Sequence, residues 1–179
     1  MGSIARYRQG DIHDVEFPAD PVNHPIEEGD LVFVHPSTNK VWPAADMANQ
    51  GSASLNQDAF QQYFAGVALK KCGAKAGEKT FRLDVSEDNV CRVATAGRFE
   101  FDCAATAWKP GDLVGVAADT NGCSNQKVTT AASASLSIGR AAPHAAALGQ
   151  TMTRVVVDIQ STVMAGGVQN QVSGSGSGQ

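Results

Sequence analysis

The sequence predicts a mainly β protein: a small β-barrel or β-sandwich built from two similar β-units, with one short helical insertion and an extended N-terminal arm. Three observations support this fold class. Apolar residues alternate with polar ones along most of the chain. Several blocks of sequence occur twice in the same order, and 18 Gly among 179 residues suit turns between short strands. A chain of this length is expected to form one domain with its own core.

The first 25 residues are expected to form an extended arm outside that core. Pro18, Pro21 and Pro25 fall within this stretch. Proline fixes φ and removes a backbone donor, which disfavours the interior of a sheet. At the other end, residues 168–179 include the run VSGSGSGQ, whose composition predicts a flexible tail. Residues 26–167 are therefore assigned to the folded domain.

Within this domain, apolar runs bounded by Gly, Asn and Asp predict strands. Such runs cover residues 31–34, 80–85 and 155–159. Residues 90–103 contain two further runs on either side of Gly97, which predicts a hairpin that turns at this glycine. Most of the domain is therefore expected to be sheet.

Residues 55–64 are the segment with clear helical spacing. Leu55, Ala59 and Tyr63 would share one face of a helix, and Phe60 with Phe64 would lie adjacent at helical spacing. The candidate caps are Ser54 or Asn56 at the start and Gly66 at the end. We expect this helix to be an insertion in the first β-unit.

The near-repetition of GDLVFV as GDLVGV is the starting point of a longer match. The matched blocks are GDLVFV with GDLVGV, NKVWPAA with QKVTTAA, FAGVAL with SIGRAA, and TFRLDV with TRVVVDI. Four blocks in one order indicate an internal duplication, covering about residues 26–85 and 108–159. Gly29 with Asp30, and Gly111 with Asp112, are predicted to form structural turns, because glycine tolerates positive φ and aspartate can bond its own backbone.

No catalytic, cofactor-binding or metal-binding residues are predicted. The segment GAKAGEKT at residues 73–80 departs from a phosphate loop, because three residues separate its glycines and Glu78 precedes Lys79. The four Cys and four His are scattered, whereas zinc sites usually show closely spaced ligand pairs. The cysteines are expected to be small buried apolar residues.

Charge and hydropathy argue against two classes of partner. The formal net charge is −4, whereas a nucleic-acid-binding domain normally carries a clustered basic face. No stretch approaches the ~20 apolar residues of a membrane span, and the start MGSIARYRQGD lacks the apolar core of a secretory leader. We therefore expect neither a nucleic-acid nor a membrane partner.

Several blocks together resemble a family of phage and prophage capsid decoration, or cement, proteins. These are SIARYR, NQDAFQQYFAGVAL, VATAGRFEFDC followed by GDLVGV, SIGRAA and IQSTVMAGG. The resemblance covers most of residues 3–167 and rests on the order of the blocks and the hairpin pattern. The broader family is a domain-of-unknown-function family sometimes labelled as a RecA-like phage recombinase, a label without support here because the phosphate loop is lacking.

The resemblance implies a structural virion protein and not an enzyme. Such a protein is assembled in the host cytoplasm and then stabilises the outside of an icosahedral capsid by bridging subunits of the major capsid protein. The family also implies self-association, with a trimer favoured. Arg6, Tyr7 and Arg8 in the arm are the candidate capsid contacts, because arginine and tyrosine are enriched at interface hot spots and an arm can add a strand to a sheet edge.

The alternative is another virion structural role or a surface-binding module, for example one that reads carbohydrate. That role would predict exposed aromatic side chains, and the chain has two Trp and two Tyr. Trp42 and Trp108, each close to a GDLV block, are expected to anchor the core instead. An enzyme would predict a pocket with convergent titratable groups, and no such group is evident in the sequence.

Overall fold

The computed structural model describes residues 6–72, 89–142 and 150–164, with side chains from Ile12 onward. The strands are β1 (Arg6–Pro18), β2 (Leu31–Val34), β3 (Val41–Pro43), β4 (Phe64–Ala68), β5 (Val90–Thr106), β6 (Leu113–Asp119), β7 (Gly122–Thr130), β8 (Gly139–Ala141) and β9 (Met152–Gln160). The helices are α1 (Ala53–Gln62) and two 3₁₀ turns, η1 (Ala44–Asp46) and η3 (Ala134–Leu136). The predicted mainly β class with one short helix is therefore confirmed.

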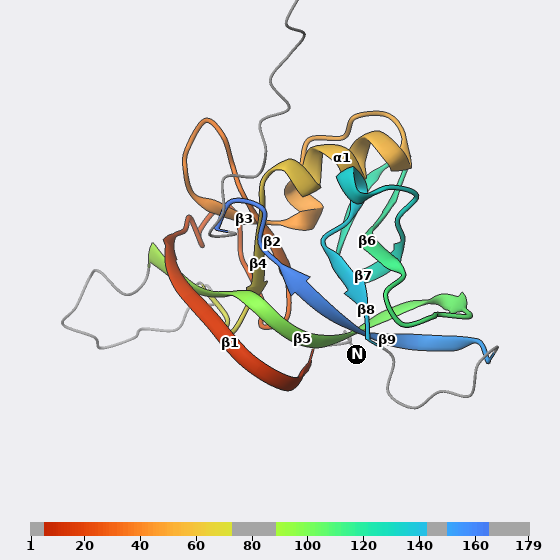
Figure 1. Ribbon diagram of the computed structural model, residues 1–179. Coiled ribbons are helices and arrows are strands. Elements are labelled where there is room, and N and C mark those ends of the chain that lie inside the picture. Colours follow the sequence, from red (N-terminus) through yellow and green to blue (C-terminus); the bar gives the residue numbers. More distant parts are fainter. Residues whose placement is uncertain (1–5, 73–88, 143–149, 165–179) are drawn as a thin grey trace, which may run out of the picture.

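The strands form two small barrels that share β5. In the second barrel, β5 pairs with β7, followed by β6, β8 and β9, and β9 returns to β5 to close the ring. In the first, β3, β2, β4, β5 and β1 follow one another, and a parallel bridge between Ala19 and Val41 joins the end of β1 to β3. In Figure 1 the two groups of short strands stand side by side, with β5 running beneath both.

The two barrels have the same pairing pattern, residue for residue. The pairs Val34–Val41, Val32–Gly66, Ala68–Val93, Phe17–Cys91 and Ala19–Val41 in the first barrel correspond to Val116–Val128, Val114–Gly139, Ala141–Val157, Phe101–Val155 and Cys103–Val128 in the second. The prediction of two similar β-units is therefore confirmed, and each unit has five strands among the described residues.

Matching positions also fill the two interiors. The equivalent buried residues are Phe17 and Phe101, Val32 and Val114, Val41 and Val128, Ala65 and Ile138, Ala68 and Ala141, Cys91 and Val155, and Val93 and Val157. The first members belong to one apolar cluster and the second members to another. Each barrel thus has its own packed core, as expected of small barrels filled by side chains.

The register corrects the predicted boundaries of the repeat. The first unit begins with β1 and ends in the first half of β5, so the strand equivalent to β9 is the stretch around Val93 and not residues 80–85. Residues 80–85 and the phosphate-loop decoy at 73–80 lie outside the described residues, as does the tail at 168–179.

The first 25 residues are not wholly outside the core, as the prolines had suggested. Phe17 and Ala19 are buried, because β1 pairs with β5 as the first strand of the first barrel. Pro18 is tolerated since it is the last residue of the strand. The prediction of extended backbone is right for β1. The prediction that this stretch lies outside the domain is wrong, because β1 is part of the first barrel.

The hairpin predicted around Gly97 is also wrong. Residues 90–106 form one continuous strand, and Gly97 lies within it at φ 141° while pairing with Ile159 of β9. Glycine tolerates this positive φ without turning the chain back. The strand therefore passes from the first barrel into the second.

Helix α1 begins earlier than predicted, and a different face of it is buried. Its N-cap is Ser52, whose side chain accepts a bond from the Leu55 amide. The predicted inner residue Leu55 is 55% exposed. Phe60, which the sequence places next to that face, is buried together with the neighbouring amides Asn56 and Gln57.

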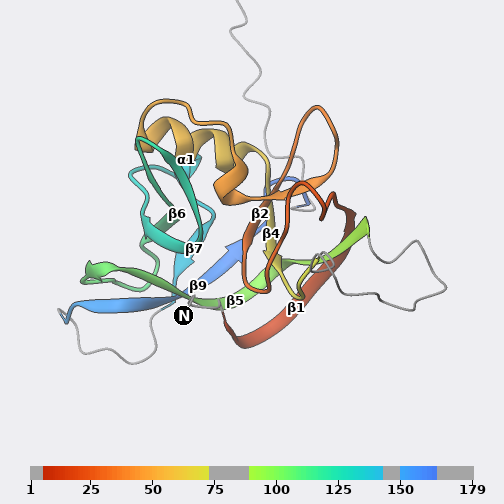
Figure 2. The ribbon, with the colours of Figure 1, turned by 180° about the vertical axis from the view of Figure 1, so that it is seen from behind.

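The buried face of α1 ties the two barrels together. The Phe60 ring lies edge-on to Phe33 of β2, at a centroid distance of 6.0 Å. The Gln57 side chain donates to the Val116 carbonyl of β6 at 2.9 Å, and the Asn56 side chain donates to the Asp119 carbonyl at 2.8 Å. Seen from either side, α1 lies across the ends of the β6 and β7 strands (Figures 1 and 2).

Substitution of three glycines tests how close the backbones of neighbouring strands lie in each barrel. A Cβ atom at Gly66 would lie 2.0 Å from the Ala94 carbonyl oxygen, and one at Gly139 would lie 2.3 Å from that of Asp158. Gly122 has φ 138° but open space around it. We predict that Gly66→Ala and Gly139→Ala each cost about 3 kcal/mol or more in urea unfolding, and Gly122→Ala about 1 kcal/mol. Equal costs for the three substitutions would contradict the pairing described.

Candidate functional site

The predicted turn residues occupy equivalent turns at the start of β2 and β6. The Asp30 carboxylate accepts a bond from the Glu27 amide at 2.8 Å, and the Asp112 carboxylate accepts one from the Lys109 amide at 2.7 Å. Gly29 and Gly111 have φ of 86° and 89°. Both turns are therefore built as the sequence predicts, with glycine in the left-handed region and aspartate bonded to nearby backbone.

The two aspartates differ in what surrounds them. Asp30 is buried, and its second oxygen accepts a bond from the Gln126 side chain of β7 at 2.9 Å. Burial raises the pKa of the Asp30 carboxyl, although the Glu27 and Gln126 bonds oppose that shift. Asp112 is only half-buried. The first turn is consequently also a polar joint between the two barrels.

The predicted capsid contacts Arg6, Tyr7 and Arg8 lie at the start of β1. Their backbone follows β5, with Arg6 opposite Glu100 and Tyr7 opposite Phe99. The structure therefore attaches this stretch to the chain's own sheet. Whether these three residues contact a shell stays a prediction.

The other edge of β1 is the main candidate docking surface. Among the described residues, no strand pairs with that edge between Arg6 and Phe17. We call this stretch the β1 edge. An unpaired strand edge presents backbone donors and acceptors that another extended chain can bond. The β1 edge thus extends over residues 6–17, and the backbone groups of alternate residues along it are available for main-chain binding.

Charged side chains accompany the β1 edge and its sheet. Asp14 forms an ion pair with Arg92 of β5, and this hydrogen bond lowers the pKa of the Asp14 carboxyl. Further along the sheet, Arg154 of β9 lies 3.1 Å from Asp102 and 3.9 Å from Glu100. Charges on an edge strand discourage indiscriminate pairing, so a partner strand must complement them.

The aromatic residues are not arranged as an open platform. Trp108 is buried in the core, as predicted. Trp42 is only partly buried, and its ring is stacked between the His24 and His35 imidazoles at centroid distances of 3.5 and 3.8 Å. Both faces of the indole are therefore covered. Nothing in the sequence alone brings these two histidines, 11 positions apart, to the same tryptophan.

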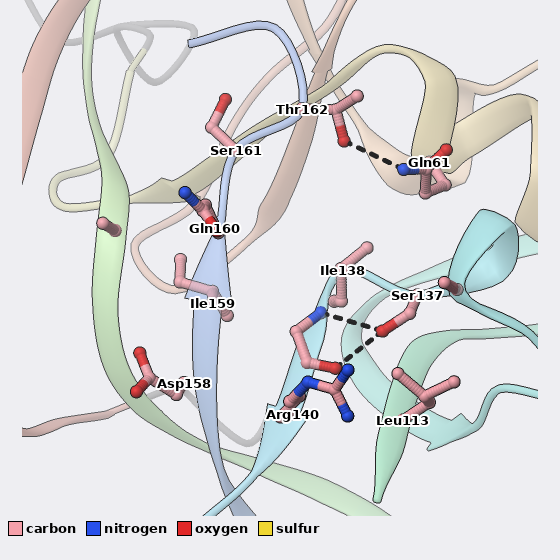
Figure 3. Close-up of a pocket in the computed structure, with 13 residues that line it drawn as sticks. Gln61, Leu113, Ser137, Ile138, Arg140, Asp158, Ile159, Gln160, Ser161 and Thr162 are labelled. Carbon is pink, nitrogen blue, oxygen red and sulfur yellow. Dashed lines mark hydrogen bonds between the residues drawn. The ribbon is translucent and has the colours of Figure 1, made fainter. Parts of the chain in front are cut away.

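One hollow lies beside β8 and β9 (Figure 3). It has a volume of about 560 Å³ and is bordered by Gln61 of α1. Its polar side chains are engaged within the fold: Arg140 donates to the Gly111 carbonyl, Gln61 to Thr162, and Ser137 bonds both polar atoms of the Gly139 backbone. These contacts hold β8 in place and do not converge on a common point.

The described residues contain no group of three or more His, Cys, Asp or Glu that could hold a metal ion. No helix in the described part of the chain is long and apolar enough to cross a membrane. No family model, curated protein or solved structure matches the sequence or the fold.

One signal that was missed could have revealed β1 as part of the repeat. Val15, Glu16 and Phe17 are equivalent to Phe99, Glu100 and Phe101 in the register, and the segments VEF and FEF are similar in sequence. The match is only three residues long, and the prolines that follow it argue against a strand. The β1 edge is therefore defined by the pairing of β1 with β5 and not by a sequence signal.

The two equivalent aspartates provide a matched test of the joint. Asp30→Ala removes the acceptor of the Glu27 amide and one of the two acceptors of the Gln126 side chain, which also bonds the Glu28 carbonyl. Asp112→Ala removes one bond near solvent. We predict a loss of about 2–3 kcal/mol in unfolding free energy for Asp30→Ala and about 1 kcal/mol for Asp112→Ala. A larger cost at Asp112 in chemical denaturation would contradict the role of Asp30 between the barrels.

Proposed function

We propose that this protein is a structural virion protein that decorates the outer surface of an icosahedral phage capsid and stabilises it by bridging major capsid protein subunits. It would be assembled onto the shell in the host cytoplasm. Self-association as a trimer is part of the proposal and comes from the family resemblance. The role itself is supported by that resemblance and by the architecture of the two barrels.

The observation that carries the proposal is the duplication within one body. Two barrels with equivalent strand pairing share β5 and are held by the Asn56 and Gln57 bonds of α1. One chain therefore holds two similarly built barrels in one body. A protein that bridges neighbouring copies of one shell protein needs two places of attachment, and we propose that each barrel supplies one.

The β1 edge supplies a mode of attachment. An extended segment of a shell subunit could add a strand beside β1, gaining main-chain hydrogen bonds. Asp14 and Glu16 are both exposed carboxylates on the same face of β1. Their negative charges would then select which shell segment binds. In this form the chain accepts a strand from the shell, whereas the sequence alone suggested that the arm inserts into the shell's sheet.

Stabilisation of the shell follows from linked contacts. Once one barrel has docked, the second binds at a high effective concentration, because the rigid body already holds it near its target. A ligand that binds one state of a partner stabilises that state by mass action. We therefore expect the decorated shell to stay in its mature form, resisting both further expansion and collapse.

The aromatic arrangement favours docking over the carbohydrate-reading alternative. Sugar recognition commonly uses an exposed aromatic face, but the faces of Trp42 are covered by His24 and His35, and Trp108 is buried. Retention on immobilised glycans would support the alternative. Absence of retention together with shell binding would support the proposal.

Substitution of the predicted contact residues tests the attachment. The triple variant Arg6→Ala, Tyr7→Ala, Arg8→Ala should bind purified shells at least ~30-fold more weakly, as expected when hot-spot residues are lost, while its thermal unfolding is nearly unchanged. Gln62→Ala on α1, which lies across the barrels from β1 (Figure 1), serves as the control and should bind normally. Unchanged shell occupancy of the triple variant would contradict a role for these residues.

The copy number in purified particles tests the role as a whole. Quantitative mass spectrometry would compare this chain with the major shell protein. A ratio within a few-fold of one supports a lattice-wide cement. A handful of copies per particle would instead assign the chain to a vertex, neck or tail, and complete absence from particles would overturn the virion role.

A further inference from the structure

The internal repeat shows what is missing beside the β1 edge. Residues 14–17 of β1 are equivalent to residues 98–101 of β5. In the second barrel, an antiparallel strand covers the outer edge of this β5 stretch: it is the start of β1, with Arg6 opposite Glu100. In the first barrel, no strand among the described residues covers the equivalent edge of β1, which lies along the margin of the molecule (Figures 1 and 2). The same edge is therefore covered in one barrel and open in the other.

The backbone of the β1 edge is oriented for strand pairing. The Ala19 amide donates to the Asn89 carbonyl, on the side of β5, at 2.7 Å. Successive residues of an antiparallel strand direct their amide and carbonyl groups to opposite sides, so those of Asp14 and Glu16 face the open edge. Pro18 occupies the next outward position, and its lack of an amide hydrogen limits the pairing there.

The charges of β1 fall into two groups along the strand. Arg6 and Arg8 lie near its start, whereas Asp11, Asp14 and Glu16 lie toward its end. Two antiparallel copies of such a strand place the basic end of each beside the acidic end of the other. Opposite charges across a strand pair stabilise it, and like charges destabilise it. The β1 edge is therefore complementary in charge to a second copy of itself.

We propose that the β1 edge pairs with the β1 edge of a second copy of this chain, so that the free protein forms a two-fold symmetric dimer. One sheet would run through both subunits. In the proposed register, Ile12 lies on the two-fold axis, Arg8 of each copy lies opposite Glu16 of the other, and Asp11 lies opposite His13. A two-fold contact of this kind uses both edges at once and does not propagate into a fibre.

Glu16 is central to the proposed contact. It is exposed, and on the β5 side it lies opposite Arg92. Arg8 of the second copy would lie on its other side, which gives a row of alternating charges across three strands. Asp14 already forms an ion pair with Arg92. The main new charge pair is therefore that of Arg8 with Glu16, as Arg6 lies opposite the equivalent Glu100 within the chain.

This inference does not rest on the proposed virion role, although both concern the same edge. The trimer in that proposal would form on the shell, whereas the dimer describes the free protein. A shell strand would then displace the second copy when it pairs with β1. Until docking, the dimer would keep an open strand edge, which is prone to unspecific pairing, covered.

Sedimentation equilibrium of the free full-length protein tests the dimer. We expect a reversible monomer–dimer equilibrium with a Kd of about 10 µM. Arg8→Glu and Glu16→Arg should each weaken the dimer about tenfold or more, because two-fold symmetry turns two attractive pairs into repulsive ones. The double variant should recover the dimer to within about threefold of the original Kd, because its charges are exchanged and not lost.

Two comparisons make the test specific to β1. Asp58→Arg reverses a charge on α1, which lies across the barrels from β1 (Figure 1), and should leave the dimer unchanged. Repulsion between Arg92 and the arginine introduced by Glu16→Arg is the same in the single and the double variant, so recovery isolates the contact between copies. A monomer or a trimer at all concentrations, or a double variant that stays as weak as the single ones, would overturn the proposal. A monomer that binds purified shells through β1 would instead assign the edge to a shell strand.

Discussion

The structure depends on one strand that belongs to both barrels. The first half of β5 contributes Cys91 and Val93 to one core, and the second half contributes Phe99 and Phe101 to the other. The strand can do this because Gly97 adopts a positive φ between the halves without reversing the chain. Each barrel would be open without its half of β5, so neither unit is a complete sheet on its own.

The joint between the barrels combines apolar packing with buried polar contacts. Phe33, Phe64 and Val67 of the first unit belong to the same apolar cluster as the core of the second barrel. Asn56, Gln57 and Asp30 are buried, and each bonds a group of the second barrel. Buried polar groups are costly when unpaired, so such bonds fix one relative position of the units more sharply than apolar contact would. A fixed relative position is what the proposed bridging role needs.

The sequence predicted the class of fold well, because local chemistry determines it. The GDLV turns need only glycine and aspartate next to an apolar run, and the same requirement appears twice. Prediction from the sequence failed where pairing between distant strands outweighs a local turn or proline signal. Gly97 predicts a turn, but its pairing with Ile159 continues the strand. The prolines near Phe17 argue against a strand that nevertheless pairs through its other residues.

The candidate site was less accessible to sequence reasoning. A free strand edge is defined by which partners are present, and no single residue marks it. The stacking of Trp42 on His24 and His35 joins segments that are distant in sequence. For α1, the helical period predicts the burial of Phe60, but Leu55 is exposed. Asn56 and Gln57 are polar, and only their partners on β6 explain their burial.

Native-state hydrogen exchange of the free protein, followed by mass spectrometry at increasing urea, would test the shared strand most directly. If β5 joins the barrels into one cooperative unit, peptides from its two halves, and from β2 and β6, should become exposed with the same opening free energy and the same dependence on urea. If the first barrel opens while β6, β7 and the second half of β5 keep their full protection, the two barrels are independent, and the account of a single rigid body is wrong.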